Sequence, residues 1–376
     1  MNRQDRIRGC MIGGAAGDAL GYAVEFLPES VIFKKYGMGG IERYAKDPVS
    51  GLALISDDTQ MSLFTADGLL TCEYRRLSCG AAGLPRMDVL NAYADWLMTQ
   101  TVSCTPLYAE PAGRRKRRSW LMGIPDLYSR RAPGNTCLSA LEHRDDYPVP
   151  DADYVRAGIN SSKGCGGVMR TAPVALLYGD NVPVLSDPEA AQIAALTHGH
   201  PLGFLPSALL NRILSLIVFG DGNQDLRTVV HEALDSVCRE FEGTEHLAAL
   251  REIIEKAVLL SENDSNDLDN IHLLGEGWVA EETLAIAVFC SLRHEYEFAE
   301  GIIAAVNHNG DSDSTGAVTG NILGAINGYS GIEDMWKQDL ELKDVILELA
   351  DDLYRIRTGS TSASDPDLAR KYGHAL

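Results

Sequence analysis

The sequence predicts an all-α fold in a single domain. Apolar residues recur at intervals of three and four along most of the chain, which is the spacing of one helical face. The segments with this spacing consist of strong helix formers and contain few β-branched runs. At 376 residues, 45% hydrophobic and 23% charged, the composition is typical of a globular protein with a sizeable core. No segment has the character of a linker between domains.

The helical pattern can be followed from one end of the chain to the other. The first helical stretch is glycine-rich and includes residues 13–21, and the next begins after residue 56. A second glycine-rich helix follows residue 311. Further helices are predicted around residues 89–97, 171–178, 190–198, 209–217, 231–241, 246–260, 281–292, 299–306 and 344–356.

Two segments lack this pattern. Residues 103–154 are long, irregular and rich in Pro, Gly and Arg, and such segments in compact domains usually border a functional site. Residues 358–376 are small and polar, and we expect them to form a loosely held tail. The predicted domain therefore spans residues 1–357.

Two glycine stripes predict where helices meet. A glycine in a helix interior costs about 1 kcal/mol relative to alanine, so close approach of another helix must offset it. Acidic residues interrupt both stretches, which argues against a pair of membrane helices. We expect the stripes to pack at the centre of a soluble bundle. Each has a spacing of four residues: Gly13, Gly17 and Gly21, and Gly316, Gly320, Gly324 and Gly328.

Charge and cysteine content exclude several classes of protein. Lys and Arg number 33 against 53 Asp and Glu, a net charge of −20, so nucleic acid is not an expected partner. We find no apolar run near the about 20 residues of a membrane helix. Asp18 interrupts the apolar stretch after the basic N-terminus, which argues against a secretion signal. Eight cysteines without a C-x-x-C pair indicate reduced thiols and a cytoplasmic location.

Two acidic clusters precede predicted helices. Ser, Thr and Asp cap helix N-termini, and capping alone would explain one acid in each cluster. It does not explain two acids, because neighbouring carboxylates repel each other unless a cation neutralises them. The clusters are Ser56-Asp57-Asp58-Thr59 and Asp311-Ser312-Asp313-Ser314-Thr315.

The ligand types predict a hard cation. Carboxylate and hydroxyl oxygens suit Mg²⁺ or Mn²⁺, whereas Zn²⁺ prefers His and Cys. His198 and His200 are two apart and do not share a helical face, so we expect no histidine-based zinc site. The segment DSDSTGAVTGNI lacks the glutamate at position twelve of an EF-hand loop. With Glu25 as a fifth acid, the set would suffice for a two-metal hydrolytic site.

Two further segments have a candidate role in binding. GCGGVMR, residues 164–170, precedes a predicted helix, where backbone amides can cradle a diphosphate, although a plain glycine-rich turn fits equally well. The basic block from Arg114 to Arg118 could steer a phosphate-bearing or protein substrate. A solvated loop is the simpler interpretation of that block.

Six motifs in order resemble the ADP-ribosylglycohydrolases. They lie between residues 12 and 329, and the pair SDDT and GDSDSTGA is the most specific part. The resemblance implies an orthogonal all-α bundle around a cleft with two Mg²⁺ or Mn²⁺ ions, and a substrate that carries ADP-ribose. The motifs are GGAAGDALGYAVEF, SDDTQMSLFTADGLL, GCGGVMRTAPVAL, THGHP, GEGWVAEETLA and HNGDSDSTGAVTGNILGAINGY.

The resemblance also implies roles for individual residues. Ser56 and Ser314 stand where other members often have Thr, and Cys165 stands where some have Asn. The implied metal ligands are Ser56, Asp57, Asp58, Asp311, Asp313 and Ser314, and the implied catalytic acids are Glu25, Asp57 and Asp58. The implied ADP-ribose contacts are Gly164, Cys165, Gly166, Gly167, Val168, Met169 and His198.

The expected reaction is hydrolysis of the glycosidic bond between ADP-ribose and a modified protein. We expect a metal-held water, assisted by Asp57, Asp58 or Glu25, to attack the anomeric carbon and release ADP-ribose. The GDALGxxVEF motif resembles members that act on ADP-ribosyl-arginine. Three alternatives stay open: hydrolysis of ADP-ribosyl-serine, a silent module that binds ADP-ribose, and a metal-free protein in which the acids only cap helices.

Overall fold

The computed structural model describes residues 1–80, 83–102, 119–145, 149–179, 183–222 and 224–373. Within these ranges the chain folds into α-helices and short 3₁₀ helices without a strand, and two isolated bridges join Ala53 to Leu340 and Gly164 to Val279. The prediction of an all-α fold is therefore confirmed. The basic block, Arg114 to Arg118, lies outside the described residues.

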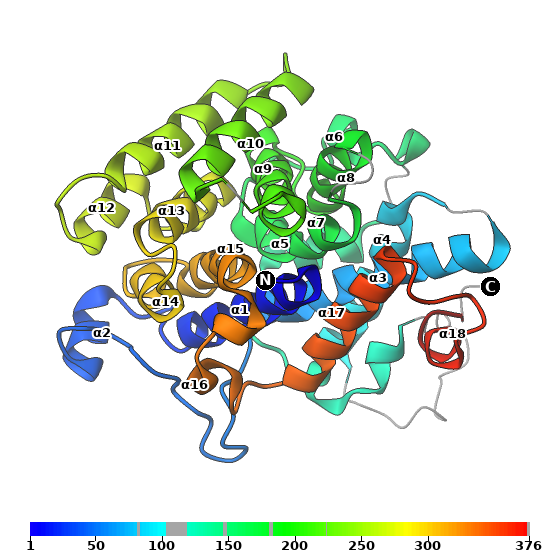
Figure 1. Ribbon diagram of the computed structural model, residues 1–376, viewed down its shortest axis with the longest axis horizontal. Helices are drawn as coiled ribbons and strands as arrows, with labels where there is room; N and C mark the ends of the chain where they lie inside the picture. Colours follow the sequence, from blue (N-terminus) through cyan, green and yellow to red (C-terminus); the bar gives the residue numbers. More distant parts are fainter. Residues whose placement is uncertain (81–82, 103–118, 146–148, 180–182, 223, 374–376) are drawn as a thin grey trace.

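The helices follow one another along the chain, and a long connection joins α2 to α3 (Figure 1). The 3₁₀ helices are η1 Trp120–Gly123, η2 Pro125–Tyr128, η3 Pro150–Ala152 and η4 Cys165–Arg170. The α-helices are α1 Arg3–Tyr22, α2 Glu29–Tyr36, α3 Asp57–Cys79, α4 Pro85–Thr101, α5 Asn135–Glu142, α6 Tyr154–Ala157, α7 Ala172–Tyr178, α8 Pro183–Ala195, α9 Pro201–Phe219, α10 Leu226–Glu240, α11 Leu247–Leu260, α12 Asp267–Leu274, α13 Ala280–Arg293, α14 Phe298–Val306, α15 Ser312–Gly331, α16 Asp334–Lys337, α17 Lys343–Arg357 and α18 Pro366–Tyr372.

Helices α1 and α15 lie against each other at the centre of the fold (Figure 1). A Cβ atom on Gly17 would lie 1.9 Å from the carbonyl oxygen of Gly316, and one on Gly13 would lie 2.2 Å from that of Gly320. The two backbones are thus in direct contact, as the glycine stripes predicted, and Gly9 extends the contact by another turn. The helices are antiparallel, because the end of α1 meets the start of α15.

The remaining helices surround this central pair. Helices α13 and α14 pack on α15, and α17 packs on α1. Helix α3 packs on α4, and α8 packs on α9. In Figure 1, α10, α11 and α12 lie on the opposite side of the molecule from α17 and α18. The arrangement leaves the starts of α3 and α15 close to the end of α1.

Helix α9 differs from what the sequence analysis found. Pro201–Phe219 is long and apolar enough to cross a membrane by length and composition, whereas no such run was expected. In the fold, 89% of its apolar window is buried among other helices. This burial explains why α9 is apolar, since it is one of the core helices of the bundle.

The residues after 357 are also not the loose tail that was expected. Residues 366–372 form helix α18, which packs against α3. Leu368 and Tyr372 are buried, and the ammonium of Lys371 pairs with Asp352, Glu348 and Asp367. These residues belong to the packed bundle.

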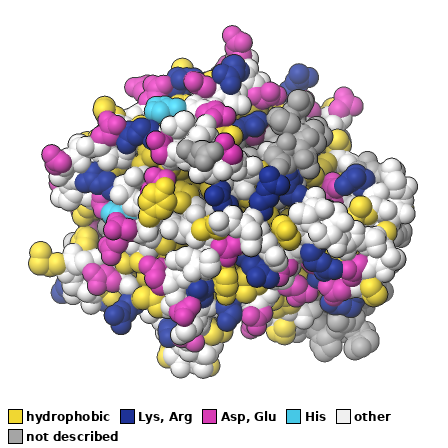
Figure 2. Space-filling view, viewed as in Figure 1, with side chains coloured by type: hydrophobic (Ala, Val, Ile, Leu, Met, Phe, Trp, Pro, Cys, Tyr) yellow, Lys and Arg dark blue, Asp and Glu magenta, His cyan; other side chains and the backbone are white. Residues whose placement is uncertain are grey.

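Acidic side chains do not form a separate patch on the face of the molecule that Figure 2 shows. Figure 2 shows acidic and basic side chains interspersed across this face of the molecule. The seven cysteines that the structure describes are free thiols, as expected.

Candidate functional site

A cavity of about 680 Å³ opens where the two acidic clusters meet. Segments that lie far apart in the sequence form its wall: the connection after α1, the start of α3, residues 130–137, helix η4 with the residue before it, the start of α15, and the connections that carry His198 and Trp278. The predicted site residues that line it are Glu25, Asp57, Asp58, Gly164, Cys165, Gly166, Met169, His198, Asp311, Asp313 and Ser314. Ser56, Gly167 and Val168 were also predicted to belong to the site but do not line the cavity.

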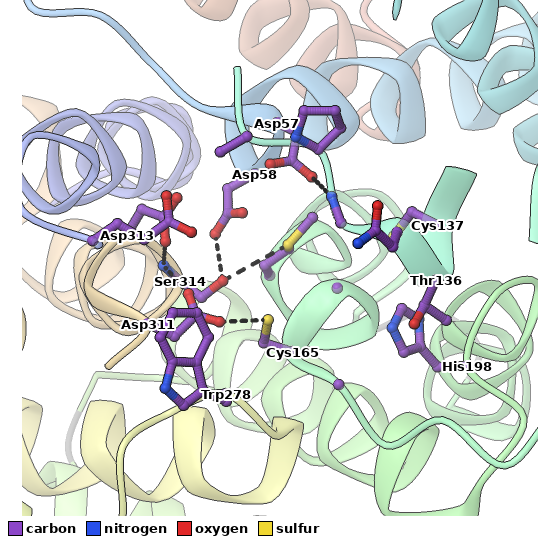
Figure 3. Close-up of a pocket in the computed structure, with 18 of the residues that line it drawn as sticks. Asp57, Asp58, Thr136, Cys137, Cys165, His198, Trp278, Asp311, Asp313 and Ser314 are labelled. Carbon is purple, nitrogen blue, oxygen red and sulfur yellow. Dashed lines mark hydrogen bonds between the residues drawn. The ribbon is translucent and has the colours of Figure 1, made fainter. Parts of the chain in front are cut away.

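Ser56 caps helix α3 instead of facing the cavity. Its hydroxyl oxygen accepts a hydrogen bond from the Asp58 N–H at 3.1 Å, and its side chain is fully buried. Its own N–H donates to the carboxylate of Asp18 at 3.0 Å. The cap turns the next two residues, Asp57 and Asp58, toward the cavity (Figure 3).

Asp18 is a buried acid that the sequence analysis did not place in the site. It comes from the interior of α1 and accepts hydrogen bonds from the N–H groups of Ser56 and Thr59 and from the Thr59 hydroxyl. Burial and the nearby Asp313 raise the pKa of Asp18 to about 7. This carboxylate fixes the N-terminus of α3 onto α1.

The start of α15 presents the second acidic cluster to the first. Asp311 caps the helix, and the Ser314 N–H donates to Asp313 Oδ1 at 2.9 Å. The Ser314 hydroxyl donates to Asp58 Oδ2 at 2.8 Å across a separation of 256 residues (Figure 3). The predicted convergence of the two clusters is thus found in the structure.

Glu25 completes a group of three acids that could hold a cation. Carboxylate oxygens of Glu25, Asp311 and Asp313 lie within 4.8 Å of one another. Glu25 is only 8% exposed, and its Oε2 atom has no hydrogen-bond partner. Burial, together with the charges of Asp313, Asp311 and Asp57, raises the pKa of Glu25 to about 11.

Three more acids of the cavity, Asp57, Asp58 and Asp311, also have raised pKa values. Burial, followed by the charge of Asp313, raises the pKa values of Asp57, Asp58 and Asp311 well above their usual range. Such a concentration of buried carboxylates is stable in the ionised form only with positive charge among them. The acids therefore fit a bound divalent cation.

The glycine-rich segment forms the opposite wall. A Cβ atom on Gly166 would lie 2.8 Å from Cys137 Sγ and from a ring carbon of His198, so only glycine fits there. Gly167 instead packs against the backbone of Gly203, and Val168 is fully buried. Gly164, Cys165, Gly166 and Met169 thus line the cavity, whereas Gly167 and Val168 pack into the interior.

His198 lies across the cavity from the acids (Figure 3). Its ring is 2% exposed, and its Nδ1 atom is 2.8 Å from the Thr197 hydroxyl. Burial, with a smaller effect of the charge of Arg170, lowers the pKa of His198 to about 3. The imidazole is therefore neutral where it lines the cavity.

Residues 130–137 form part of the wall, which confirms that the long irregular segment borders the site for this stretch. The Gly134 N–H donates to Asp57 Oδ2 at 3.3 Å, and the Arg131 carbonyl accepts from the Asp57 N–H at 3.0 Å. The backbone of this segment therefore holds the first acid of α3 in place.

Two aromatic residues at the mouth of the cavity were not predicted as site residues from the sequence. Phe26 and Trp278 stack with ring centroids 6.4 Å apart and an interplanar angle of 24°. They are 70% and 42% exposed and both line the cavity. Both lie within motifs that were noted, Phe26 at the end of GGAAGDALGYAVEF and Trp278 in GEGWVAEETLA, yet only the fold reveals that the two rings meet.

Comparison with known proteins shows the family of this chain. The family model of the ADP-ribosylglycohydrolases matches residues 1–363. The chain belongs to the ADP-ribosylglycohydrolase family. This confirms the resemblance that the six motifs indicated, and it makes the protein a hydrolase of glycosidic bonds.

Several relatives of the family match over most of the chain. The ADP-ribosyl-[dinitrogen reductase] glycohydrolase of Rhodospirillum rubrum is 24% identical and covers 90% of this chain and 91% of its own. The ADP-ribosylarginine hydrolase Tri1 of Serratia proteamaculans is 24% identical, with 93% and 79% coverage. A solved structure titled ADP-ribosylglycohydrolase-related protein complex has a TM-score of 0.65 and 26% identity, and covers 95% of this chain and 99% of its own.

Proposed function

We propose that this ADP-ribosylglycohydrolase cleaves the N-glycosidic bond between ADP-ribose and an arginine side chain of a modified protein. The observation that carries the proposal is the convergence of two acidic helix N-termini, 256 residues apart, on one cavity. The cavity also has a glycine-rich wall suited to a diphosphate. Free cysteines support a cytoplasmic location for the reaction.

The acids of the cavity would hold the cations that this chemistry uses. Their carboxylate oxygens suit hard cations, so we assign two Mg²⁺ or Mn²⁺ ions to them rather than a softer metal. When bound, such ions supply positive charge at the ribose hydroxyls and a water of lowered pKa. The proposed ligands are Asp57, Asp58, Asp311, Asp313 and Ser314, with Glu25 as ligand or base.

The protein's own residues would then orient the reactants. Asp57, held by the Gly134 N–H and the Arg131 carbonyl, is fixed toward the sugar. Glu25, with an unpartnered buried oxygen, is placed to take the proton from the attacking water. A bond forms between water oxygen and the anomeric carbon, the bond to the arginine nitrogen breaks, and that nitrogen gains a proton.

The opposite wall would bind the rest of ADP-ribose. Gly164, Cys165 and Gly166 line the cavity, where their backbone would lie against the diphosphate. The neutral side chain of His198 lines the cavity on this side, where the adenosine part would lie. This division puts the glycosidic bond at the acids and the nucleotide at η4.

The rim of the cavity supports arginine as the acceptor. A guanidinium is planar and cationic, and it stacks on aromatic rings and pairs with carboxylates, whereas a serine side chain does neither. Phe26 and Trp278 provide exposed rings directly beside Glu25 and Asp311. One relative, Tri1, is named as an ADP-ribosylarginine hydrolase.

Release of ADP-ribose from defined peptides tests the proposal. With Mg²⁺ present, we expect release from arginine-modified peptides and little from serine-modified peptides. Asp57→Ala should abolish release, while its circular dichroism spectrum stays that of the wild type.

Release from the serine-modified peptide alone would contradict arginine as the acceptor. Full activity of Asp57→Ala would contradict the role of this acid. Binding of ADP-ribose in calorimetry without turnover of either peptide would favour a silent binding module over an enzyme.

A further inference from the structure

Arg170 is a buried cation to which the proposed function gives no role. It is the last residue of η4, and its side chain is fully buried. In the described part of the chain no carboxylate pairs with its guanidinium. The group lies instead over the ring of Tyr93, 4.6 Å from the centroid, and contacts Cys137 Sγ at 3.3 Å. Burial of a charge without a counter-ion lowers stability, which suggests that this side chain serves the site.

Among the described residues, the shortest hydrogen bond of this guanidinium goes to Thr197. Nη2 of Arg170 lies 2.6 Å from Thr197 Oγ1 and 3.3 Å from the Ile193 carbonyl oxygen. A guanidinium carries donors only, so the hydroxyl oxygen accepts this bond. The proton of the hydroxyl then remains for another partner. The two candidates are the Nδ1 atom of His198 at 2.8 Å and the Ala194 carbonyl oxygen at 3.5 Å.

The distances favour His198 as the acceptor of that proton. A separation of 3.5 Å is long for a hydrogen bond from a hydroxyl, whereas 2.8 Å is the usual length. The positive charge of Arg170 also polarises the hydroxyl and makes it a better donor. Burial and, to a lesser degree, this charge lower the pKa of His198 and keep its ring neutral. A neutral imidazole that accepts at Nδ1 carries its proton on Nε2.

The Nε2 atom of His198 lies beside the glycines of the cavity wall. A Cβ atom on Gly164 would lie 3.2 Å from it, and one on Gly166 would lie 3.3 Å from it. All three residues line the cavity, and Nε2 has no hydrogen-bond partner among the residues that the structure describes. A proton on Nε2 therefore gives this wall an unused donor. A lone pair in the same place would repel the oxygens of an anionic ligand.

We propose that Arg170 and Thr197 are positioning residues that hold His198 in its Nε2–H tautomer. In this form the ring donates a hydrogen bond to an oxygen of the ADP-ribose bound at the glycine-rich wall. Each donor fixes the next one: the guanidinium donates to the hydroxyl, the hydroxyl to Nδ1, and Nε2 to the ligand. The inference rests on the proposed function for the identity of the ligand, and it names what orients the ring.

Nitrogen NMR of the full chain with ¹⁵N-labelled histidine tests the tautomer directly. The ring signals of His198 are assigned by their absence in His198→Gln. At pH 7 and before any ligand is added, Nε2 should carry the proton and Nδ1 should carry none. In Thr197→Val the proton should be shared between the two nitrogens, because the donor to Nδ1 is gone. Thr197→Ser keeps the hydroxyl and should keep the Nε2–H form.

Calorimetry with ADP-ribose and Mg²⁺ measures the consequence for binding. Thr197→Val should bind ADP-ribose about 2- to 10-fold more weakly, the value of one hydrogen bond, and Thr197→Ser should bind it like the wild type. Thr171→Val is the matched control. The Thr171 hydroxyl is also buried and also neighbours Arg170 in the chain, but it donates to the Val168 carbonyl at 3.3 Å, so the affinity should not change. Circular dichroism checks the fold of each variant.

An Nδ1–H or doubly protonated His198 in the wild type would overturn the inference, and this measurement needs no stability variant. It would also be overturned by a folded Thr197→Val that keeps either the Nε2–H form or the wild-type affinity, or by an equal loss in Thr171→Val. Hydrolysis of modified peptides by a protein with an Nδ1–H ring refutes only the role of Arg170 and Thr197. An Nε2–H ring in a protein that binds ADP-ribose without hydrolysing any peptide refutes only the proposed reaction.

Discussion

Asp18 shows how a single residue can organise the site without facing it. Its buried carboxylate accepts from the N–H groups of the N-cap residue Ser56 and of Thr59 in the first turn of α3, and so ties this helix to α1. These amides would otherwise be buried donors without partners, which costs about 1–3 kcal/mol for each group. The positions of Asp57 and Asp58 therefore depend on a side chain from another helix.

Replacement of Asp18 by asparagine should reduce stability. In the presence of Mg²⁺ we expect the free energy of unfolding to fall by about 1–3 kcal/mol, since an amide replaces a charged acceptor of several hydrogen bonds. Urea denaturation measures the change. Asp47→Asn is the control, because exposed Asp47 also accepts from two backbone N–H groups, those of Val49 and Ser50. An equal change in both variants would contradict the role given to Asp18.

We expect the Trp278 ring to contribute to binding of the arginine acceptor rather than to the stability of the fold. Trp278→Ala should raise KM for an arginine-modified peptide about two- to fivefold, the value of an exposed cation–π contact, with a smaller change in kcat. Steady-state kinetics of ADP-ribose release measures it. Trp278→Phe keeps an aromatic face and should retain most of the affinity. The stacking role would be wrong if Ala and Phe behaved alike.

At the scale of elements, the antiparallel pairing of α1 and α15 sets the geometry of the cavity. Gly17 meets Gly316, and Gly21 meets Ser312, so the end of α1 lies at the start of α15. Glu25 follows α1 by three residues and is thereby brought to Asp311 and Asp313. The glycines offset their cost in helix propensity by allowing this contact between backbones.

Gly17→Ala should therefore disturb both the helix pair and the site. Its Cβ would lie 1.9 Å from the Gly316 carbonyl oxygen, and overpacking of this kind costs about 1–3 kcal/mol or more. Thermal unfolding should show a lower Tm. Gly331→Ala is the control in α15, where the nearest neighbour of a Cβ is 3.4 Å away and the change should be small or stabilising. Similar losses in the two variants would contradict the close-contact explanation.

At the scale of the whole molecule, the cavity gathers negative charge in a protein that already carries a net charge of −20. The buried acids bind protons more tightly in the folded state than in the unfolded chain, where their pKa values are near 4. The pKa of Asp18 is raised to about 7 and that of Glu25 to about 11. Without cations, therefore, the folded state binds more protons than the unfolded state above about pH 4.

The sign of this difference predicts how pH and metal act together. The metal-free protein should lose stability as pH rises from about 4 through 8, because raised acid pKa values favour the folded state only while the groups stay protonated. Mg²⁺ should raise Tm more at pH 8 than at pH 5, where protons already neutralise the acids. Differential scanning calorimetry with Mg²⁺ or EDTA measures this. A metal effect of equal size at both pH values would contradict it.

The sequence by itself determined the helical class, the close packing of the two glycine-rich helices at the centre of the bundle and the position of an acidic cluster at the start of each of two helices. These follow from local rules, since periodicity, helix capping and glycine spacing act within one turn or one helix. The same rules wrongly predicted a loose tail for residues 366–372. These polar residues form a packed helix because Lys371 forms an ion pair with the distant Asp352. The rules also missed the apolar length of α9.

Only the tertiary structure decided which residues share the cavity. It left Ser56, Gly167 and Val168 outside the wall, and it brought Phe26 to Trp278 and Cys165 to Asp311. These contacts depend on the register of α1 against α15 and on the path of the connecting segments. No local pattern encodes such long-range geometry, because it is set by the packing of the whole bundle.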